Sequence, residues 1–268
     1  IRKINFSNIH MQRIAIDTSI VLYQYVVAIR SRGADLETSD GKITSHIYGI
    51  LSKALGLLEK GILPIFVFDG EPPELKKYIL DNRKKMRENA KKKIDTVKDE
   101  EERIKLLKRS VVINHIQMNE CKEILRSLGL PVVEAPEEAD SQCAFLSKKN
   151  FVYGVASEDM DLLTFGSKYL LRNFSISKKK EMIEISLEKI LEGFEMSMEQ
   201  FIDLCILLGC DYTPTIGGIG TKKAFSFIKK YKSIEGVIGY INNNNMKRYQ
   251  IPEHFNYKEA REYFKSCV

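Results

Sequence analysis

Short apolar runs recur along the first two thirds of the chain, and most of them end next to an acidic residue. They cover 13–17, 61–70, 130–134, 151–156 and 169–174. Runs that are apolar throughout, without alternation, are typical of strands buried on both faces of a parallel sheet. Segments of helical periodicity lie between them, at 43–60, 119–128 and 137–149. This succession predicts an α/β fold with a mainly parallel central sheet flanked by helices.

Two stretches depart from this pattern. Residues 75–115 contain no Gly or Pro and too few apolar positions for a core of their own, so we expect a helical insert that projects from the domain. After residue 187 the strand signals fade, and helical patterns follow at 197–208, 222–231 and 257–265. The sequence therefore predicts an α/β core over 1–186 and a helical region over 187–268 that packs on this core.

The composition excludes several classes of protein. Apolar residues make up 44% of the chain, enough for a substantial core, so full disorder is excluded. No uncharged apolar stretch reaches the roughly 18 residues of a membrane span, and residues 1–13 lack the apolar run of a signal peptide. The five cysteines form no Cys-x-x-Cys pair, which argues against a disulfide framework or a zinc site. We therefore expect an intracellular protein with no membrane partner.

Positive charge is concentrated in one stretch. The net charge of the chain is +6, while residues 76–93 alone carry nine Lys or Arg against two acids. A block of this kind is often a solvated helix face. Here the following residues, 94–109, balance five acids against five bases. The one-sided block therefore favours contact with a polyanion, with nucleic acid as the leading candidate.

Acidic side chains follow four of the predicted strands: Asp17, Asp69, Glu138 with Asp140, and Asp159 with Asp161. Each alone has a structural alternative, as a helix cap, a first-turn acid or a turn residue. Together they are expected at one edge of the sheet, because the carboxyl ends of parallel strands meet there. Hard cations relieve the repulsion between carboxylates, and oxygen ligands suit Mg²⁺ or Mn²⁺. Two such ions suit the hydrolysis of a phosphodiester.

Two further features lie in the C-terminal part. Asp211 follows Gly209, which is typical of a helix end, and Asp211 reaches the same edge only if that helix packs on the sheet. The loop at 216–220 is Gly-rich and leads into a Lys-rich helix. Backbone amides at such a helix start suit a phosphate, and the alternative is a tight helix–helix turn that needs positive φ.

Four segments carry a resemblance to a known family: Val67–Pro73, Ala135–Asp140, Ser157–Gly166 and Phe201–Tyr212. Together they closely resemble the flap endonuclease family of structure-specific 5′ nucleases, in order from about residue 13 to residue 265. The resemblance implies hydrolysis of DNA at the junction of duplex and 5′ flap, as endonuclease and 5′–3′ exonuclease, in replication and repair. It also implies that 75–115 form a helical arch and that 187–268 bind duplex DNA through a helix-hairpin-helix-like element.

The resemblance assigns roles to single residues. Lys76 and Arg83 match a basic pair at the foot of the arch, and their seven-residue spacing places both on one helix face, aimed at the scissile phosphate. The expected catalytic set adds Asp69, Glu138 and Asp159. The family usually has Glu at the place of Asp140, so Asp140 is expected to act through water. Seven carboxylates would hold two Mg²⁺ ions, which Mn²⁺ can replace: Asp17, Asp69, Glu138, Asp140, Asp159, Asp161 and Asp211.

Other residues match places that contact DNA in the family. Tyr23 would stack on a base near the cut site, with a core helix position as the alternative. Arg30 and Thr44 match contacts to the template strand and the 3′-flap pocket. A further group would line the arch or else lie in solvent: Lys84, Lys85 and Arg87. The last group would hold duplex DNA around a K⁺ ion: Gly217, Gly218, Gly220, Lys222 and Lys223.

Three alternatives stay open on the sequence alone. A sister 5′ nuclease would act as an exonuclease on nicks or cut bubbles or four-way junctions, a related nuclease would cut RNA, and a non-catalytic homologue would only bind DNA. The expected partner is branched DNA with a 5′ flap, bound by a monomer. The expected place is the nucleus of a eukaryotic cell or a viral replication compartment. The family's sliding-clamp motif is not found in this chain.

Overall fold

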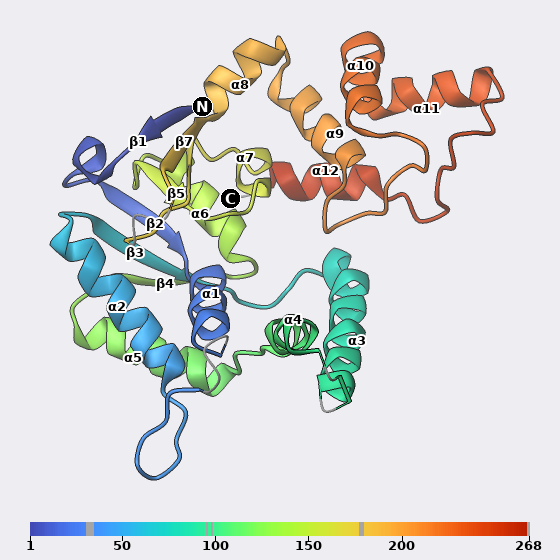
Figure 1. Cartoon of the computed structure of the whole chain (residues 1–268). Helices are drawn as coiled ribbons and strands as arrows, with labels where there is room; N and C mark the ends of the chain where they lie inside the picture. Colours follow the sequence, from blue (N-terminus) through green and yellow to red (C-terminus); the bar gives the residue numbers. More distant parts are fainter. Residues whose placement is uncertain (31–34, 95, 98, 177–179, 267–268) are drawn as a thin grey trace.

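A seven-stranded sheet forms the centre of the molecule, in the order β1-β7-β6-β5-β2-β3-β4 (Figure 1). The computed structural model describes residues 1–30, 35–94, 96–97, 99–176 and 180–266. Strands β4, β3, β2, β5 and β6 are parallel, while β7 is antiparallel to β6 and β1. The prediction of a mainly parallel sheet is confirmed. The strands are β1 (Arg2–Ile4), β2 (Arg13–Asp17), β3 (Leu63–Phe68), β4 (Val132–Glu134), β5 (Gly154–Ala156), β6 (Tyr169–Arg172) and β7 (Met182–Ser186).

Helices cover both faces of this sheet (Figure 1). Helices α1 (Thr18–Arg30), α2 (Ser45–Glu59) and α5 (His115–Ser127) cover one face, while α6 (Ala139–Lys148) and α7 (Asp161–Thr164) lie on the other. Strand β2 explains the arrangement, because Ile14 and Ile16 pack into the first layer and Ala15 into the second, all fully buried. A strand with apolar side chains on both faces needs cover on both sides.

The sequence does not predict β1, β7 or the helices α8 (Leu187–Phe194) and α11 (Ile234–Asn243). Both strands are short and carry charged side chains, as in Arg2 and Glu184, which pair with each other across the sheet at 3.1 Å. Short strands at the antiparallel side of a sheet lack the continuous apolar signal on which the sequence prediction depends.

The predicted helical insert consists of η2 (Glu74–Lys76), α3 (Lys77–Ile94) and α4 (Glu100–Ser110), which pack against each other beside the sheet (Figure 1). Asp99 caps α4 by accepting a hydrogen bond from the Glu101 amide at 3.0 Å. The basic stretch of the sequence lies on α3, of whose residues only Ala90 is buried. No helix among the described residues is both long enough and apolar enough to cross a membrane.

The C-terminal helices α9 (Met198–Leu208), α10 (Thr221–Tyr231) and α12 (Tyr257–Lys265) share one apolar core with the second face of the sheet. Aromatic rings join the two parts: the Phe165 centroid lies 4.8 Å from that of Phe264, and the Tyr212 centroid lies 5.1 Å from Phe264. This contact holds the loop after α9 against the end of the sheet where the acidic residues lie.

A buried ion pair joins α12 to α9. Arg261 contacts both carboxylate oxygens of Asp203 at 2.6 and 2.8 Å, and Asp203 is 3% exposed. Arg261→Met is expected to lower the free energy of unfolding by about 3–5 kcal/mol, because it leaves a buried carboxylate without its cation. Urea unfolding measures the loss. Arg126→Met, which breaks a half-exposed pair with Glu134, is the control and should cost about 1 kcal/mol or less. Equal losses for the two variants would contradict the prediction.

Candidate active site

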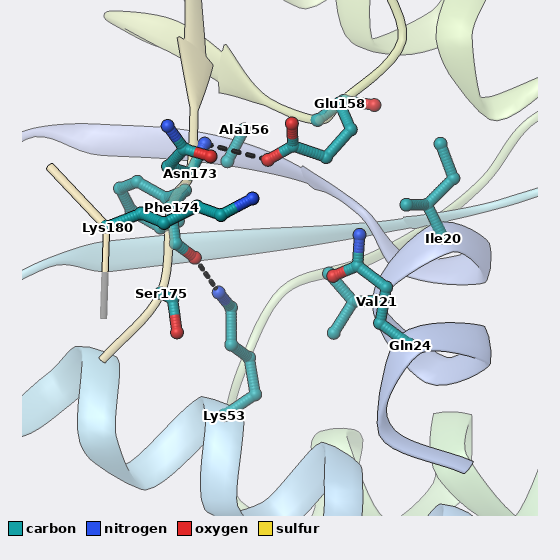
Figure 2. A pocket seen from close by; sticks show the side chains of 11 residues that line it. Ile20, Val21, Gln24, Lys53, Ala156, Glu158, Asn173, Phe174, Ser175 and Lys180 are labelled. Carbon is teal, nitrogen blue, oxygen red and sulfur yellow. Dashed lines mark hydrogen bonds between the residues drawn. The ribbon is translucent and has the colours of Figure 1, made fainter. Parts of the chain in front are cut away.

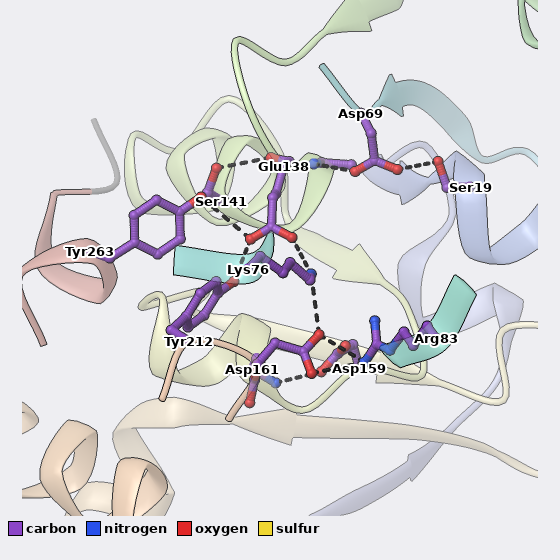
Figure 3. A network of polar contacts seen from close by, with 12 residues as sticks. Ser19, Asp69, Lys76, Arg83, Glu138, Ser141, Asp159, Asp161, Tyr212 and Tyr263 are labelled. Atoms are coloured by element: carbon purple, nitrogen blue, oxygen red, sulfur yellow. Dashed lines mark hydrogen bonds and ion pairs between the residues drawn. The ribbon is translucent and has the colours of Figure 1, made fainter. Parts of the chain in front are cut away.

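Acidic side chains from four strand ends converge at the carboxyl edge of the sheet. Figure 3 shows Asp69, Glu138, Asp159 and Asp161 among them. Asp17 ends β2, and Asp69 follows β3. The Ser157 hydroxyl donates to Asp17 Oδ2 at 3.1 Å and accepts from the Asp159 amide at 3.1 Å, so it connects the ends of β2 and β5. The expectation that these acids lie together is met by the geometry.

The chain after β3 lies in direct contact with the chain after β4. A Cβ atom on Gly70 would lie 2.2 Å from the Ala135 carbonyl oxygen, so only glycine fits there. The Gly70 amide donates to the Glu137 carbonyl at 2.6 Å, and the Ala139 amide donates to Asp69 Oδ1 at 2.8 Å. These backbone contacts bring Asp69 to the start of α6, where the next acids lie.

Glu138 is the residue before α6, but its carboxylate does not cap the helix. It accepts hydrogen bonds from the hydroxyls of Tyr212 and Tyr263, the second at 3.3 Å, and forms an ion pair with Lys76 (Figure 3). Two hydroxyls and one ammonium therefore hold a buried carboxylate in place. Neither tyrosine is among the site residues predicted from the sequence: Tyr212 stands next to Asp211 in its motif, whereas Tyr263 carries no sequence signal.

The acids raise one another's pKa. Burial and then the charge of Asp69 raise the pKa of Asp17 to about 7. Burial and then the charge of Asp159 raise the pKa of Asp161 to about 7. The pKa of Asp140 lies well above its ordinary value, through burial and then the charges of Asp17 and Asp159. The cluster therefore holds more negative charge than its surroundings stabilise.

In the metal-free protein, the free energy of unfolding is expected to fall as the pH rises from about 4 to about 7, because the acids of this cluster lose their protons. Folding raises the pKa of Asp161 from 3.8 to about 7, so the folded state binds more protons in this window. The contribution is complete below pH 4 and is lost as the pH passes 7. A pKa change of about three corresponds to of the order of 4 kcal/mol. Urea unfolding in chelator, compared between the wild type and Asp161→Asn, measures it; parallel pH profiles would contradict the prediction.

Two cations from the insert reach the acidic cluster. Lys76 Nζ lies 3.2 Å from Asp211 Oδ2 and also pairs with Glu138, and Arg83 contacts both carboxylate oxygens of Asp211 at 2.8 and 2.9 Å. Burial lowers the pKa of Lys76, but its pairing with Glu138 and Asp211 outweighs burial and raises this pKa above its ordinary value. The structure therefore brings Asp211 to the edge of the sheet, which the sequence left open.

The chemical type of the clustered side chains suits divalent cations. They are carboxylates, and Asp140 Oδ1 is buried without a hydrogen-bond partner. Within the described part of the chain, no three His, Cys, Asp or Glu side chains are arranged so that they could hold a metal ion in their present positions. Instead of a metal ion, Lys76 forms an ion pair with Glu138, and Arg83 forms one with Asp211. The residues that would hold metal ions are thus present together, with protein cations pairing with two of them.

A cleft of about 400 Å³ lies beside the segment 157–159 (Figure 2). Glu158 accepts a hydrogen bond from the Asn173 amide at 2.7 Å. Lys53 of α2 donates to the Phe174 carbonyl, and burial lowers the pKa of Lys53 to about 8. The hydrogen bond between Glu158 and Asn173 therefore connects the residue before Asp159 to the end of β6.

The predicted DNA contacts near α1 lie in two environments. Tyr23 is 42% exposed, so it is not a core residue, and its hydroxyl donates to the Lys108 carbonyl at 3.0 Å. Arg30 Nε contacts both carboxylate oxygens of Asp35 at 3.0 and 2.9 Å. The Thr44 hydroxyl donates to the Leu36 carbonyl at 3.2 Å. Tyr23 lies close to the insert, whereas Arg30, the last residue of α1, and Thr44, the residue before α2, pair with nearby residues of the chain.

The remaining predicted residues lie on two separate surfaces. Lys84 and Lys85 are exposed on α3, and Arg87 is half-buried beside Arg83. In the glycine loop, Gly217 exchanges backbone hydrogen bonds with Gln250 at 2.8 and 3.1 Å, and Gly218 has a φ of 83°. Gly220 precedes α10, Lys222 lies exposed in its first turn, and Lys223 donates to the Gly218 carbonyl at 3.2 Å. The loop is a turn with positive φ, and it also leads into a basic helix.

Comparisons with known proteins agree with this geometry. Residues 1–90 match the model of the XPG N-terminal domain, and residues 129–211 match that of the XPG I-region. The chain is 45% identical over 263 residues to Flap endonuclease 1 of Aedes aegypti, an alignment that covers 96% of this chain and 68% of that protein. The chain belongs to the flap endonuclease family. The prediction made from the four motifs is confirmed.

Further members of the family give the same picture. Flap endonuclease 1 of Trypanosoma brucei brucei is 46% identical over 262 residues, which are 94% of this chain and 66% of that protein. The chain thus spans about two thirds of the length of these relatives. Flap endonuclease-1 from Methanococcus jannaschii superposes with a TM-score of 0.70 at 30% identity, over 98% of this chain and 81% of the other. The catalytic core of Rad2 in complex with DNA substrate gives 0.71 at 27%, over 92% and 69%.

Proposed function

We propose that the chain is a structure-specific 5′ flap endonuclease and 5′–3′ exonuclease that hydrolyses DNA at junctions of duplex and single strand with two Mg²⁺ ions. The observation that carries the proposal is the convergence of carboxylates from four strand ends with the two cations of the insert. An anionic cluster with adjacent arginine and lysine suits a phosphodiester held between metal ions and protein donors.

The metal ligands belong to this proposal and are Asp17, Asp69, Glu138, Asp140, Asp159, Asp161 and Asp211. Bound Mg²⁺ supplies a water of lowered pKa and neutralises charge that develops on the phosphate. Tyr212 and Tyr263 orient Glu138, and Ser157 orients Asp17. Lys76 and Arg83, once released from the carboxylates, donate to phosphate oxygens beside the cut. Tyr23 offers a ring on which a base stacks.

The same proposal assigns a role to each part of the chain. Residues 1–186 form the nuclease core, with an arch over 75–115, and residues 187–268 hold the duplex. The supporting feature is the glycine loop before α10, with exposed Lys222 at the helix start, where phosphates bind well. A K⁺ ion at 216–220 would compete with Lys223 for the Gly218 carbonyl. We place the protein, as a monomer on branched DNA, in the nucleus of a eukaryotic cell or a viral replication compartment.

An end-labelled DNA with a 5′ flap tests the proposal. Mg²⁺ should support cleavage at the junction with a 5′-phosphate product, and excess chelator should abolish it. A nicked duplex and a four-way junction are cut in parallel to compare specificities. Preference for the four-way junction would favour a junction resolvase, preference for RNA flaps an RNA nuclease, and binding without any turnover a non-catalytic homologue. Each of these three outcomes overturns the proposal.

A further inference from the structure

A buried lysine lines the cleft beside the segment 157–159. Lys53 of α2 is 4% exposed, and lysine is rarely buried to this extent unless a carboxylate pairs with it. Its amino group instead donates to the Phe174 carbonyl and lies 4.9 Å from the centroid of the Phe174 ring. Glu158, the acid that lines the same cleft, forms an ion pair with Arg172 at 3.1 Å. Because a neutral amine also donates to a carbonyl, the main polar contact of Lys53 does not require its positive charge.

The surroundings of Lys53 favour its neutral form. Burial lowers the pKa of Lys53 to about 8, although the charge of Glu158 acts in the opposite direction. At pH 7.5 about a quarter of such an amine is neutral, compared with about one part in a thousand of an amine with the ordinary pKa of 10.5. A neutral amine is a nucleophile, and lysines in desolvated sites form Schiff bases with carbonyl compounds. The environment of Lys53 therefore suits reaction with an aldehyde.

The cleft gives a ligand access to this amine. Its volume of about 400 Å³ lies within the range of about 300–1,000 Å³ that is usual for ligand sites. Figure 2 shows the side chains of Lys53, Gln24 and Lys180 pointing into it from α2, from α1 and from the segment before β7. Lys180 is exposed, and its charge favours an anionic ligand. A ligand that fits this cleft combines a carbonyl group with negative charge.

The same cleft adjoins the acidic cluster. Ser157 lines it, and the Ser157 hydroxyl donates to Asp17 Oδ2 at 3.1 Å. DNA that is held at the cluster, as the proposed function requires, therefore lies next to the opening of the cleft. A DNA sugar that has lost its base opens to an aldehyde at C1′ and carries phosphate groups on both sides. It therefore has both properties that the cleft favours.

We propose that Lys53 forms a Schiff base with the aldehyde of a ring-opened abasic sugar in DNA. The inference rests on the proposed function, because DNA held at the acidic cluster supplies the sugar. Lys53 Nζ attacks C1′, a carbon–nitrogen double bond forms, and the aldehyde oxygen leaves as water after it has taken up the two amine protons. Hydrolysis reverses the step, and no bond of the DNA backbone breaks. The protein thereby holds abasic DNA through a reversible covalent bond.

Reductive trapping tests the proposal. The full chain is incubated in chelator at pH 7.5 with flap DNA that carries one abasic sugar, placed at successive positions on both sides of the junction, and cyanoborohydride then reduces the Schiff base to a stable amine. The wild type should give a covalent protein–DNA adduct on a denaturing gel. Lys53→Arg should lower its yield at least about tenfold, because a guanidinium stays charged. Lys60→Arg, at an exposed lysine directly after α2, should keep the wild-type yield.

Peptide mass spectrometry of the wild-type adduct locates the modified residue without any variant, and it should find Lys53. Free 2-deoxyribose 5-phosphate, which carries the same aldehyde without DNA, is trapped in parallel and should give a lower yield. Four results would overturn the inference: no wild-type adduct, an adduct at other amines only, an unchanged yield in Lys53→Arg, or an adduct with the free sugar phosphate only. Failure of the proposed function appears separately, as a lack of Mg²⁺-dependent cleavage of an unmodified flap by the wild type. An adduct at Lys53 in a protein that does not cleave would support the Schiff base and refute the nuclease.

Discussion

Asp159→Ala is expected to abolish Mg²⁺-dependent cleavage of a 5′ flap and to leave flap binding nearly intact. Asp159 lies after β5 at the acidic cluster, and its charge contributes to the raised pKa of Asp17, Asp140 and Asp161. Under the proposed function, removing it takes away a proposed metal ligand and several kcal/mol of stabilisation of the transition state, which corresponds to at least about a 10³-fold loss of rate. Single-turnover cleavage at saturating protein measures the loss.

The fold should survive this substitution, because one negative charge leaves a group of mutually repelling acids. Unfolding in chelator should show equal or higher stability for the variant. Glu137→Ala is the matched control, since Glu137 is an exposed acid in the neighbouring motif whose backbone, but not side chain, contacts Gly70. This control should cleave within about twofold of the wild type, as surface substitutions away from a site usually do. Robust cleavage by Asp159→Ala would refute the metal assignment.

Arg83→Met is expected to reduce the rate of cleavage by about 10²–10³-fold, as the loss of one positioned donor to a reacting group does. The guanidinium reaches the cluster, where it contacts both oxygens of Asp211. Stability should change by about 1 kcal/mol or less, because the Arg83 side chain is 52% exposed. Rates from single-turnover experiments and urea unfolding separate the two effects.

Lys84→Met controls for the loss of one positive charge from the same helix. Lys84 is exposed, and it is the next residue after Arg83, so it points away from the Arg83 face of α3. It should weaken DNA binding slightly, with little effect on the saturated rate, since a phosphate contact contributes mainly salt-dependent affinity. Equal losses of rate for the two variants would show that Arg83 acts only through its charge, contrary to the prediction.

The sequence predicts the acidic cluster because the positions of its members follow from the topology of a parallel sheet. Asp17, Asp69 and Asp159 each follow an apolar run, and parallel strands bring such ends together whatever the details of packing. The position of Asp211 could not be predicted in this way, because it depends on how the chain after α9 packs through Tyr212 and Phe264. That packing is a tertiary contact between residues distant in sequence, and no local pattern reports it.

The sequence does not predict which side chains pair with each other. The pairing of Arg30 with Asp35, the bond from Lys223 to Gly218 and the pairing of Lys76 with Glu138 each depend on side-chain positions that the folded structure sets. Periodicity identifies a basic helix face, but it does not tell which carboxylate the face meets. For the same reason Tyr263, 125 residues from Glu138, could not be assigned to the site.

The contact at Gly70 limits what this site tolerates during sequence change. A methyl group there would collide with the Ala135 and Pro136 carbonyls, whereas one on Gly193 of α8 would meet nothing within 4 Å. Alanine at 193 is therefore compatible with the fold and favours the helix by up to about 1 kcal/mol. Alanine at 70 would instead force the ends of β3 and β4 apart and change the spacing of Asp69 and Glu138. The close approach that the absence of a side chain at Gly70 allows therefore sets the spacing between the proposed metal ligands Asp69 and Glu138.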